Sequence, residues 1–273
     1  MVQVEPSLQL TLKHVSRCGA ALSCEALAAL DHSLPIKRAE AGVRSLTVWG
    51  RITTRSGKDY LIAEGGCDTA RVYGSRVTFE PKVFFSQDGI RWADLPPLQP
   101  EVAARAARVR TMLTGDPAFQ CGAGERDDPA APGEAAGAGD GEDGGGAKST
   151  VTEAQRLRGM VDAINELAAV QPKGCCVANA HNQLVANKLF SGLEHPGKLE
   201  SYQHRSQALA PDASLAQDVR GSWSVAADPF KGVTVLRSLL YPGYFFYYDS
   251  RGLTWGGFYA GDGLRNDDLA FML

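Results

Sequence analysis

The chain has 273 residues, a formal net charge of −3 and 44% hydrophobic residues, which is enough to bury a core in one large domain or two small ones. The near balance of 28 basic and 31 acidic residues argues against a strongly basic nucleic-acid binder. The sequence shows no secretory leader and no apolar run long enough to span a membrane, and its six cysteines form no CxxC pair or zinc-ligand pattern. We therefore expect a soluble chain of the cytoplasm with reduced thiols.

Residues 121–148 differ in composition from the rest of the chain. They include nine Gly, seven Ala and seven acidic residues, with no aromatic and no large aliphatic side chain. A segment of this composition cannot bury enough apolar surface to offset the entropy lost on ordering. We predict one domain over residues 1–273, interrupted at about 121–148 by a flexible, solvent-exposed insert that is dispensable for folding.

Two helices are predicted near the start of the chain, followed by two strands. Apolar residues repeat at helical spacing over 8–15, and Ser23 can cap a second helix that Pro35 is expected to stop, since proline has no backbone N–H. From residue 43 the apolar period changes to two, which indicates a strand. Its apolar side is expected to carry Leu46, Val48 and Ile52, and a turn at Ser56-Gly57 leads into a second run over 60–63.

The middle of the chain is predicted to hold a hairpin and a helix. Asp88-Gly89 is expected to form a tight turn between the runs 83–85 and 90–92. Apolar residues at helical spacing then predict a helix that opens at Pro100 and closes at Gly115.

The last part of the chain is predicted to be one helix followed by strands. Thr150 and Glu153 have the spacing of a capping box, and the helix that follows has an apolar face up to Leu167. Strand patterns then occupy 222–225, 233–240, 244–248 and 253–259. Because helices and hairpins are segregated along the chain, we predict an α+β fold, an antiparallel sheet with helices packed on one side.

Sequence motifs for catalysis or cofactor binding do not occur. The chain has no GxxxxGK[ST] or GxGxxG phosphate loop and no HExxH or GxSxG motif, and its five histidines are scattered. The adjacent Cys175 and Cys176 are expected to point in different directions and to be buried structural thiols. We predict no catalytic residue, no cofactor and no metal, although a site assembled from distant residues stays an alternative.

Aromatic side chains are concentrated near the C-terminus, where 241–259 holds nine of the 22 in the chain. Alternate residues of a strand over 244–248 would point to opposite sides, so both sides of that strand need cover. A packed core, a partner face and a platform for stacking nucleic-acid bases are three alternatives, the last disfavoured by the few basic residues nearby. Arg237, a charge among aliphatic residues, is expected to be paired inside the fold or used across an interface, and we favour an internal partner. The candidate partner-interface residues are Tyr241, Tyr244, Phe246 and Tyr248.

Several short motifs follow one another in a characteristic order. They are Trp49-Gly50-Arg51-Ile52, the run from Asp59 to Gly65, Leu95-Pro96-Pro97, Gly115-Asp116-Pro117, Gly221-Ser222-Trp223-Ser224, the run from Val235 to Gly243, and the run from Asp267 to Leu273. In these motifs the chain resembles the radial spoke head protein 9 family of the motile ciliary axoneme. The resemblance spans about 43–119 and 150–273, is weak through 175–220, and departs from the family pattern at Tyr241, where animal relatives typically carry Trp.

The resemblance implies a non-catalytic structural subunit of the radial spoke head, in the cytoskeleton of cilia and flagella. It also implies that radial spoke head proteins 4 and 6 and other spoke-head subunits are partners. Contact with the central pair would be indirect and would help to regulate dynein and cilium movement, with no nucleic acid or membrane involved. The alternatives are a cytosolic enzyme whose site is assembled from dispersed residues, and a general protein-interaction module.

Overall fold

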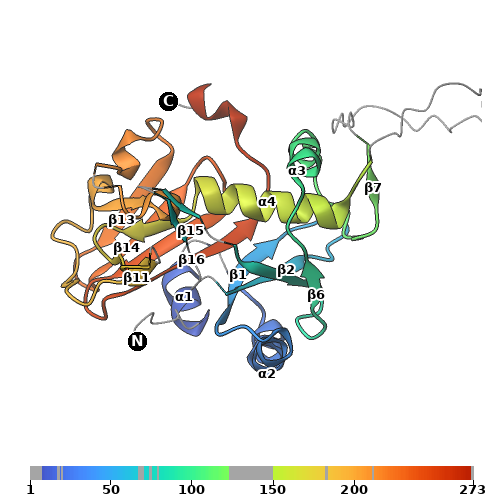
Figure 1. Ribbon diagram of the computed structural model, residues 1–273, viewed down its shortest axis with the longest axis horizontal. Helices are drawn as coiled ribbons and strands as arrows, with labels where there is room; N and C mark the ends of the chain where they lie inside the picture. The colour runs from blue at the N-terminus through green and yellow to red at the C-terminus, as the bar shows by residue number, and fades with distance from the viewer. Residues whose placement is uncertain are drawn as a thin grey trace, which may run out of the picture.

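The centre of the structure is an eight-stranded sheet (Figure 1). The computed structural model describes residues 8–16, 19, 21–66, 71–73, 76–78, 80–122, 150–181, 184–210 and 212–271. The strand order is β13-β14-β15-β16-β1-β2-β5-β6, and all neighbours are antiparallel except β1 and β16, which are parallel. These strands are β1 (Leu46–Ile52), β2 (Tyr60–Gly65), β5 (Lys82–Ser86), β6 (Ala93–Leu95), β13 (Trp223–Asp228), β14 (Val233–Ser238), β15 (Tyr244–Asp249) and β16 (Thr254–Gly261).

Helices cover both faces of this sheet (Figure 1). On one face lies α4 (Glu153–Leu167), which packs Leu157, Val161 and Ile164 onto the strands, and α3 (Pro100–Ala106) lies beside α4. On the other face lie α1 (Leu8–Val15) and α2 (Cys24–Ala41), which contribute Val15 and Leu30 to a separate apolar cluster. The predicted α+β fold is confirmed, but the sheet is mixed and not purely antiparallel as predicted, because β1 and β16 run parallel. The expectation of helices on one side only is wrong, because the strands carry apolar residues on both faces and each face requires cover.

Short strand pairs and 3-10 helices surround the main sheet. The pairs are β3 (Arg71–Tyr73) with β4 (Arg76–Thr78), β7 (Gln120–Cys121) with β8 (Val151–Thr152), β9 (Val170–Pro172) with β12 (Tyr202–His204), and β10 (Cys176–Ala178) with β11 (Leu184–Ala186). The 3-10 helices are η3 (Leu199–Ser201), η4 (Arg205–Gln207), η5 (Leu215–Gln217) and η6 (Asp267–Phe271).

A β-bulge in β1 changes which side chains share a face. The pairing of β1 with β2 shifts register between Val48 and Gly50. Leu46 and Val48 therefore belong to the clusters beneath α1 and α2, whereas Trp49 and Ile52 belong to the cluster beneath α4. The prediction that Ile52 shares a side with Leu46 and Val48 is wrong, since the extra residue reverses the alternation of the strand.

The second helix is longer than its sequence predicts. Helix α2 continues through Pro35 to Ala41 and ends at Gly42, which has a left-handed φ of 61°. Proline removes one backbone hydrogen bond there, and the burial of Leu30 against the sheet, with partly buried neighbours, offsets this cost. The predicted cap is confirmed, since the Ser23 hydroxyl accepts a backbone N–H of the first turn at 3.1 Å.

The hairpin around Asp88 has a wider loop than predicted. Val83 pairs with Leu95, so the returning strand is β6 and not the run 90–92. The Asp88 carboxylate accepts the backbone N–H groups of Ile90 and Arg91 at 2.8 and 2.9 Å. These bonds, that from Arg91 foremost, hold the pKa of Asp88 below its ordinary value. The Asp88 side chain thus binds the N–H groups of Ile90 and Arg91, which in a two-residue turn would have been available for pairing between the strands.

The predicted helix over 100–115 is shorter in the structure, where α3 ends at Ala106. Val109 and Leu113 are buried, but they lie in an irregular segment. The Arg156 guanidinium donates to the carbonyl oxygens of Val109 and Thr111, at 3.4 and 2.6 Å. A side chain of α4 therefore satisfies backbone acceptors of this irregular segment.

The capping box of α4 lies two residues later than predicted. The Thr152 hydroxyl accepts the N–H of Gln155 at 3.3 Å, and the Gln155 side chain accepts the N–H of Thr152 at 3.0 Å. The prediction of Thr150 with Glu153 is therefore wrong. The same spacing of a hydroxyl and a side-chain acceptor occurs twice here, and burial of Glu153 decides between the two frames.

The predicted insert at 121–148 lies outside the described residues, apart from Cys121 and Gly122. Cys121 is buried and pairs with Val151 in the two-stranded β7-β8 ladder, so the predicted start of the insert at Cys121 is wrong. The pairing places residues 121 and 151 next to each other.

Gly159 offers a test of the contact between α3 and α4. A Cβ added there would lie 3.5 Å from the side chains of Ala106 and Leu98, which is ordinary van der Waals contact. We expect Gly159→Ala to raise the free energy of unfolding by about 0.5–1 kcal/mol, because alanine loses less conformational entropy in a helix. Urea unfolding measures this change, and a decrease would show that the two helices leave no room for a methyl group.

Candidate interaction site

The four predicted interface residues are part of the core. Tyr241, Tyr244, Phe246 and Tyr248 are 5%, 5%, 1% and 0% exposed. The predicted alternation is confirmed, since alternate residues of β15 contribute to the clusters on opposite faces of the sheet. The structure therefore favours the core alternative, and these side chains are not accessible to a partner in the folded chain.

Two of these tyrosines fasten backbone segments to the sheet through their hydroxyl groups. The N–H of Val170 donates to the Tyr244 hydroxyl at 3.2 Å, and the N–H of Leu193 donates to the Tyr248 hydroxyl at 3.0 Å. Burial raises the pKa of Tyr244 to about 12, and it raises the pKa of Tyr248 as well. Both hydroxyls therefore stay neutral at physiological pH and anchor segments 55 or more positions away in the sequence.

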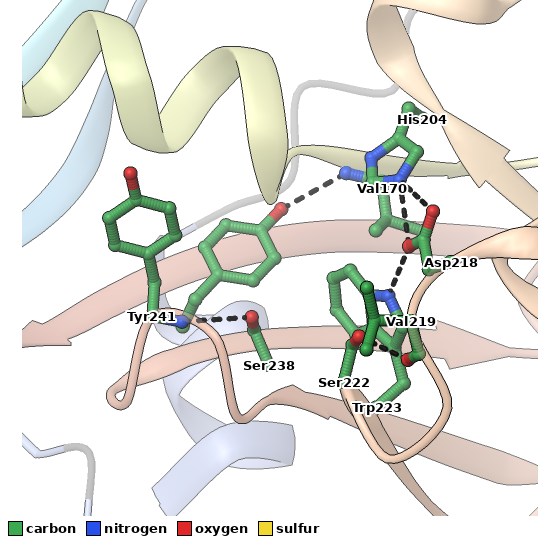
Figure 2. Close-up of polar contacts among 9 residues, drawn as sticks. Val170, His204, Asp218, Val219, Ser222, Trp223, Ser238 and Tyr241 are labelled. Atoms are coloured by element: carbon green, nitrogen blue, oxygen red, sulfur yellow. Dashed lines mark hydrogen bonds and ion pairs between the residues drawn. The ribbon is translucent and has the colours of Figure 1, made fainter. Parts of the chain in front are cut away.

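A polar cluster includes Trp223, whose ring centroid lies 6.4 Å from that of Tyr244, and its polar contacts are drawn in Figure 2. The Asp218 carboxylate, which follows η5, lies 2.9 Å from His204 Nε2 and accepts the indole N–H of Trp223 at 2.6 Å. Burial of Asp218 opposes its ionisation, but the hydrogen bonds from His204 and Trp223 outweigh burial and hold its pKa below the ordinary value. One carboxylate thus joins the end of β12 to the start of β13.

The His204–Asp218 pair has the geometry of part of a hydrolase triad, so it bears on the enzyme alternative. Within the described part of the chain, the other ring nitrogen of His204, Nδ1, is buried and has no hydrogen-bond partner. The nearby Ser222 hydroxyl donates to the carbonyl of Val219 instead (Figure 2). Among the described residues, no hydroxyl or thiol is hydrogen-bonded to this nitrogen, and the hydrogen bonds that the pair does make link β12 to β13.

The lowered pKa of Asp218 predicts how the free energy of unfolding depends on pH in acid. A carboxyl group with a lowered folded pKa contributes stability above its unfolded pKa, and this contribution is lost as the pH falls through the folded value. We expect Asp218→Asn to lower the free energy of unfolding by about 1–2 kcal/mol at pH 7 and to reduce its dependence on pH below about pH 4. Urea unfolding from neutral to acid pH measures both, with the exposed Asp212→Asn as control. An unchanged acid slope in Asp218→Asn would contradict the assignment.

Buried charged side chains of α4 are a feature that the sequence did not predict. Glu153, Arg156 and Arg158 are 0%, 1% and 4% exposed. Arg158 pairs with Asp162 at 2.8 Å and donates to the carbonyl of Leu95 at 2.9 Å. The apolar periodicity of this helix indicates only its aliphatic residues, while the charges between them contact neighbouring strands and loops. In the sequence, the charges at Glu153, Arg156 and Arg158 interrupt an otherwise apolar helical face, and this pattern indicates that charged side chains are buried there.

Arg237 is not paired inside the fold as predicted. Its side chain is exposed, and its guanidinium lies 6.0 Å from the ring centroid of Phe245 on the neighbouring strand. An exposed guanidinium over an aromatic ring keeps its hydration while its stem covers apolar surface, so no buried partner is required.

Exposed apolar side chains line a cavity on the α2 side of the molecule. This cavity of about 660 Å³ lies between α2 and the loop after β5, and its lining includes Ile36, Ile90 and Trp92. Ile36 and Ile90 are 61% and 64% exposed. At its edge Lys37 pairs with Asp94 at 3.0 Å. Aliphatic side chains held open to solvent and rimmed by charges are typical of protein contact surfaces. We call this surface the α2 groove.

The described residues contain neither a metal-ligand cluster nor a membrane-spanning helix. Within them, no group of three or more His, Cys, Asp or Glu side chains is placed to hold a metal ion. No helix in the described ranges has both the length and the apolar character of a transmembrane segment. The four cysteines in the described part, Cys24, Cys121, Cys175 and Cys176, are free.

Comparison with known proteins gives the family. No protein-family profile matches the chain. Over 98% of its length it is 33% identical to the radial spoke head protein 9 homolog of Xenopus tropicalis, and the match covers 99% of that protein. The homologs of Danio rerio and Homo sapiens are 31% and 29% identical over the same shares of both chains.

These matches extend through the whole described body, including the segment 175–220, where the motifs are weak. The chain is therefore one of the radial spoke head proteins, which are axonemal proteins of motile cilia and flagella. Within that class it belongs to the radial spoke head protein 9 family. The predicted family and the predicted localisation are confirmed.

Proposed function

We propose that this chain is a non-catalytic structural subunit of the radial spoke head, and that it helps to transmit central-pair contacts to the regulation of dynein and motility. The observation that carries the proposal is the match over 98% of the chain to proteins named as radial spoke head protein 9 homologs. The fold supports it, because a sheet covered on both faces and crossed by buried hydrogen bonds is a stiff body. Stiffness suits a subunit that passes on a mechanical contact.

The proposed partners are radial spoke head proteins 4 and 6 and other spoke-head subunits, with the central pair contacted indirectly. Since the aromatic residues of β15 are buried, docking requires another surface. The α2 groove supplies one, with exposed Ile36 and Ile90 beside the indole of Trp92. A stable contact of this kind would bury more than about 1,000 Å² in total.

Co-sedimentation tests the proposal. A tagged copy of the chain is expressed in cells that build motile cilia, axonemes are isolated and extracted with high salt, and the extract is sedimented. We expect the tag to travel with the other spoke-head proteins in one large particle. A free protein of about 29 kDa in the soluble fraction would contradict the structural role and would favour the enzyme alternative.

A groove variant and a control variant distinguish the proposed structural role from the proposed docking surface. We expect Ile36→Asp combined with Ile90→Asp to release the chain from the particle, because two charges would enter an apolar contact. Phe230→Asp is the matched control, since Phe230 is 88% exposed and lies in the turn between β13 and β14, away from the α2 groove. If the groove variant stays in the particle as the control does, the chain docks through another surface and the structural role still stands.

A further inference from the structure

The structure brings the sulfur atoms of two adjacent cysteines together. Cys175 Sγ and Cys176 Sγ are 3.6 Å apart. The expectation that these thiols point in different directions is wrong, because Cys175 lies in a bend after Gly174, which has a φ of 75°, and only Cys176 belongs to β10. The alternation of a regular strand therefore does not apply to this pair.

The two thiols differ in their access to solvent. Cys175 is 1% exposed. Cys176 is half-buried and lines a surface cavity of about 280 Å³, together with Val177, Gln203 and Leu209 among others. A small solute therefore reaches Cys176 from the cavity, while Cys175 lies behind it within contact distance.

The surroundings favour a thiolate at Cys176. The hydrogen bond from Cys175 and the positive charge of Arg205 lower the pKa of Cys176, against the opposing effect of its burial. The same hydrogen bond, together with burial, raises the pKa of Cys175. The pair thus has one accessible group with thiolate character and one buried thiol that keeps its proton, which is the arrangement of an attacking and a resolving cysteine.

We propose that Cys175 and Cys176 form a peroxide-sensitive dithiol that closes to a reversible disulfide between adjacent residues. In the first step the Cys176 thiolate attacks one oxygen of hydrogen peroxide, the O–O bond breaks, and hydroxide leaves, which gives a sulfenic acid at Cys176. In the second step the Cys175 sulfur attacks the Cys176 sulfur, the S–O bond breaks, and the hydroxyl group leaves with the Cys175 proton as water. Two thiols are oxidised, and one peroxide is reduced to two waters after the released hydroxide takes up a proton.

Such a disulfide would be easy to reduce. Adjacent Cα atoms are about 3.8 Å apart, whereas disulfide-bonded residues usually have Cα atoms about 4.4–6.8 Å apart. Closing the ring also moves the segment that holds the hairpin of β10 and β11, because the Cys175 carbonyl accepts the N–H of Asn187 at 2.8 Å and Cys176 pairs with Ala186. Oxidation would therefore change the shape of this exposed hairpin and would be reversed by thiols.

Peroxide treatment of the intact folded chain, followed by digestion with trypsin and mass spectrometry, tests the proposal. Trypsin releases residues 174–188 as one peptide, which contains no cysteine other than this pair. After a brief exposure to hydrogen peroxide and alkylation of the remaining thiols, we expect this peptide to lose the mass of two hydrogens and to escape alkylation. Dithiothreitol should restore both thiols. We expect the reaction to be about tenfold faster than oxidation of the exposed Cys24.

Single substitutions distinguish this mechanism from general thiol oxidation. We expect Cys176→Ser to abolish fast oxidation of the peptide, and Cys175→Ser to leave a sulfenic acid at Cys176 that dimedone traps. Cys175→Ala gives the same readout if serine is not tolerated at the buried position, and thermal unfolding of each variant checks its fold. An unmodified peptide under conditions that oxidise Cys24, or a Cys176 in Cys175→Ser that dimedone does not label, would overturn the proposal.

Discussion

Replacing Glu153 with Ala is expected to lower the free energy of unfolding by about 3–5 kcal/mol. The carboxylate is completely buried and accepts four hydrogen bonds of 2.7 Å each. Its donors are the hydroxyl of Tyr60, the N–H and hydroxyl of Thr114, and the N–H of Gly115. Without the carboxylate these donors stay buried with no acceptor, and each unsatisfied group costs about 1–3 kcal/mol.

Urea unfolding of the variant measures this loss, and two further substitutions show its origin. Glu153→Gln keeps the volume but places an amide N–H₂ group among donors, so we expect a loss of about 1–3 kcal/mol. Glu101→Ala is the matched control, because Glu101 is an exposed glutamate in the first turn of α3, and we expect a change within about 0.5 kcal/mol. A loss below about 1 kcal/mol in Glu153→Ala would show that water replaces the carboxylate.

The network around Glu153 explains why the first turn of α4 is fixed in place. Its partners lie 93, 39 and 38 residues away in the sequence, the first on β2 and the other two on the loop before β7. The helix, the sheet and the Gly115-Asp116-Pro117 motif are therefore joined by one side chain. Burial, and then the contact with Glu153, raise the pKa of Tyr60, so its hydroxyl stays protonated and acts as a donor. Removing the Glu153 carboxylate would leave this hydroxyl without its acceptor.

Local patterns in the sequence predicted the elements whose causes are local. The alternation over β15, the N-cap at Ser23 and the helix over 8–15 all depend on residues within a few positions of one another, and all three are confirmed. The resemblance in ordered motifs likewise predicted the family. These signals are carried by spacing along the chain, so no tertiary information is required to detect them.

The errors arose where a distant residue decides the local structure. Arg156, 45 or more positions away, takes up the carbonyl groups that a longer α3 would have used. The loop at Asp88 is the exception, because its carboxylate accepts backbone N–H groups only two and three positions away. Burial of Glu153 moves the capping box to Thr152, and the bulge in β1 sends Ile52 to the opposite face. The candidate interface failed for a related reason, because aromatic density by itself does not distinguish a core from a contact surface.

The structure shows why two positions of the family motifs are occupied by glycine. Gly243, in the Tyr241-Pro242-Gly243 motif, has a φ of 100° and lies against the backbone of Ala260. Gly50, in the Trp49-Gly50 motif, lies against the backbone of Tyr259. In both places a strand or turn approaches β16 so closely that a Cβ atom has no room. The motifs thus mark two close approaches to β16, one by β1 and one by the turn before β15.

Gly50→Ala is therefore expected to destabilise the chain by about 3 kcal/mol or more. An added Cβ would lie 2.8 Å from the Tyr259 nitrogen and closer still to its carbonyl oxygen, and backbone atoms cannot move aside as a flexible side chain can. The affected pair, β1 with β16, is the parallel pair among the described strands of the main sheet and joins strands β13 to β16 to the strands from the first half of the chain.

The expected damage is specific to that junction. Hydrogen exchange should speed up most at the amides of β1 and β16, because the parallel pair must open to admit the methyl group. Gly159→Ala is the control, since it adds the same methyl group where the neighbours are 3.5 Å away, and it should raise stability instead. If Gly50→Ala lowered the free energy of unfolding no more than Gly159→Ala does, β1 and β16 would separate without cost. The sheet would then be two independent halves.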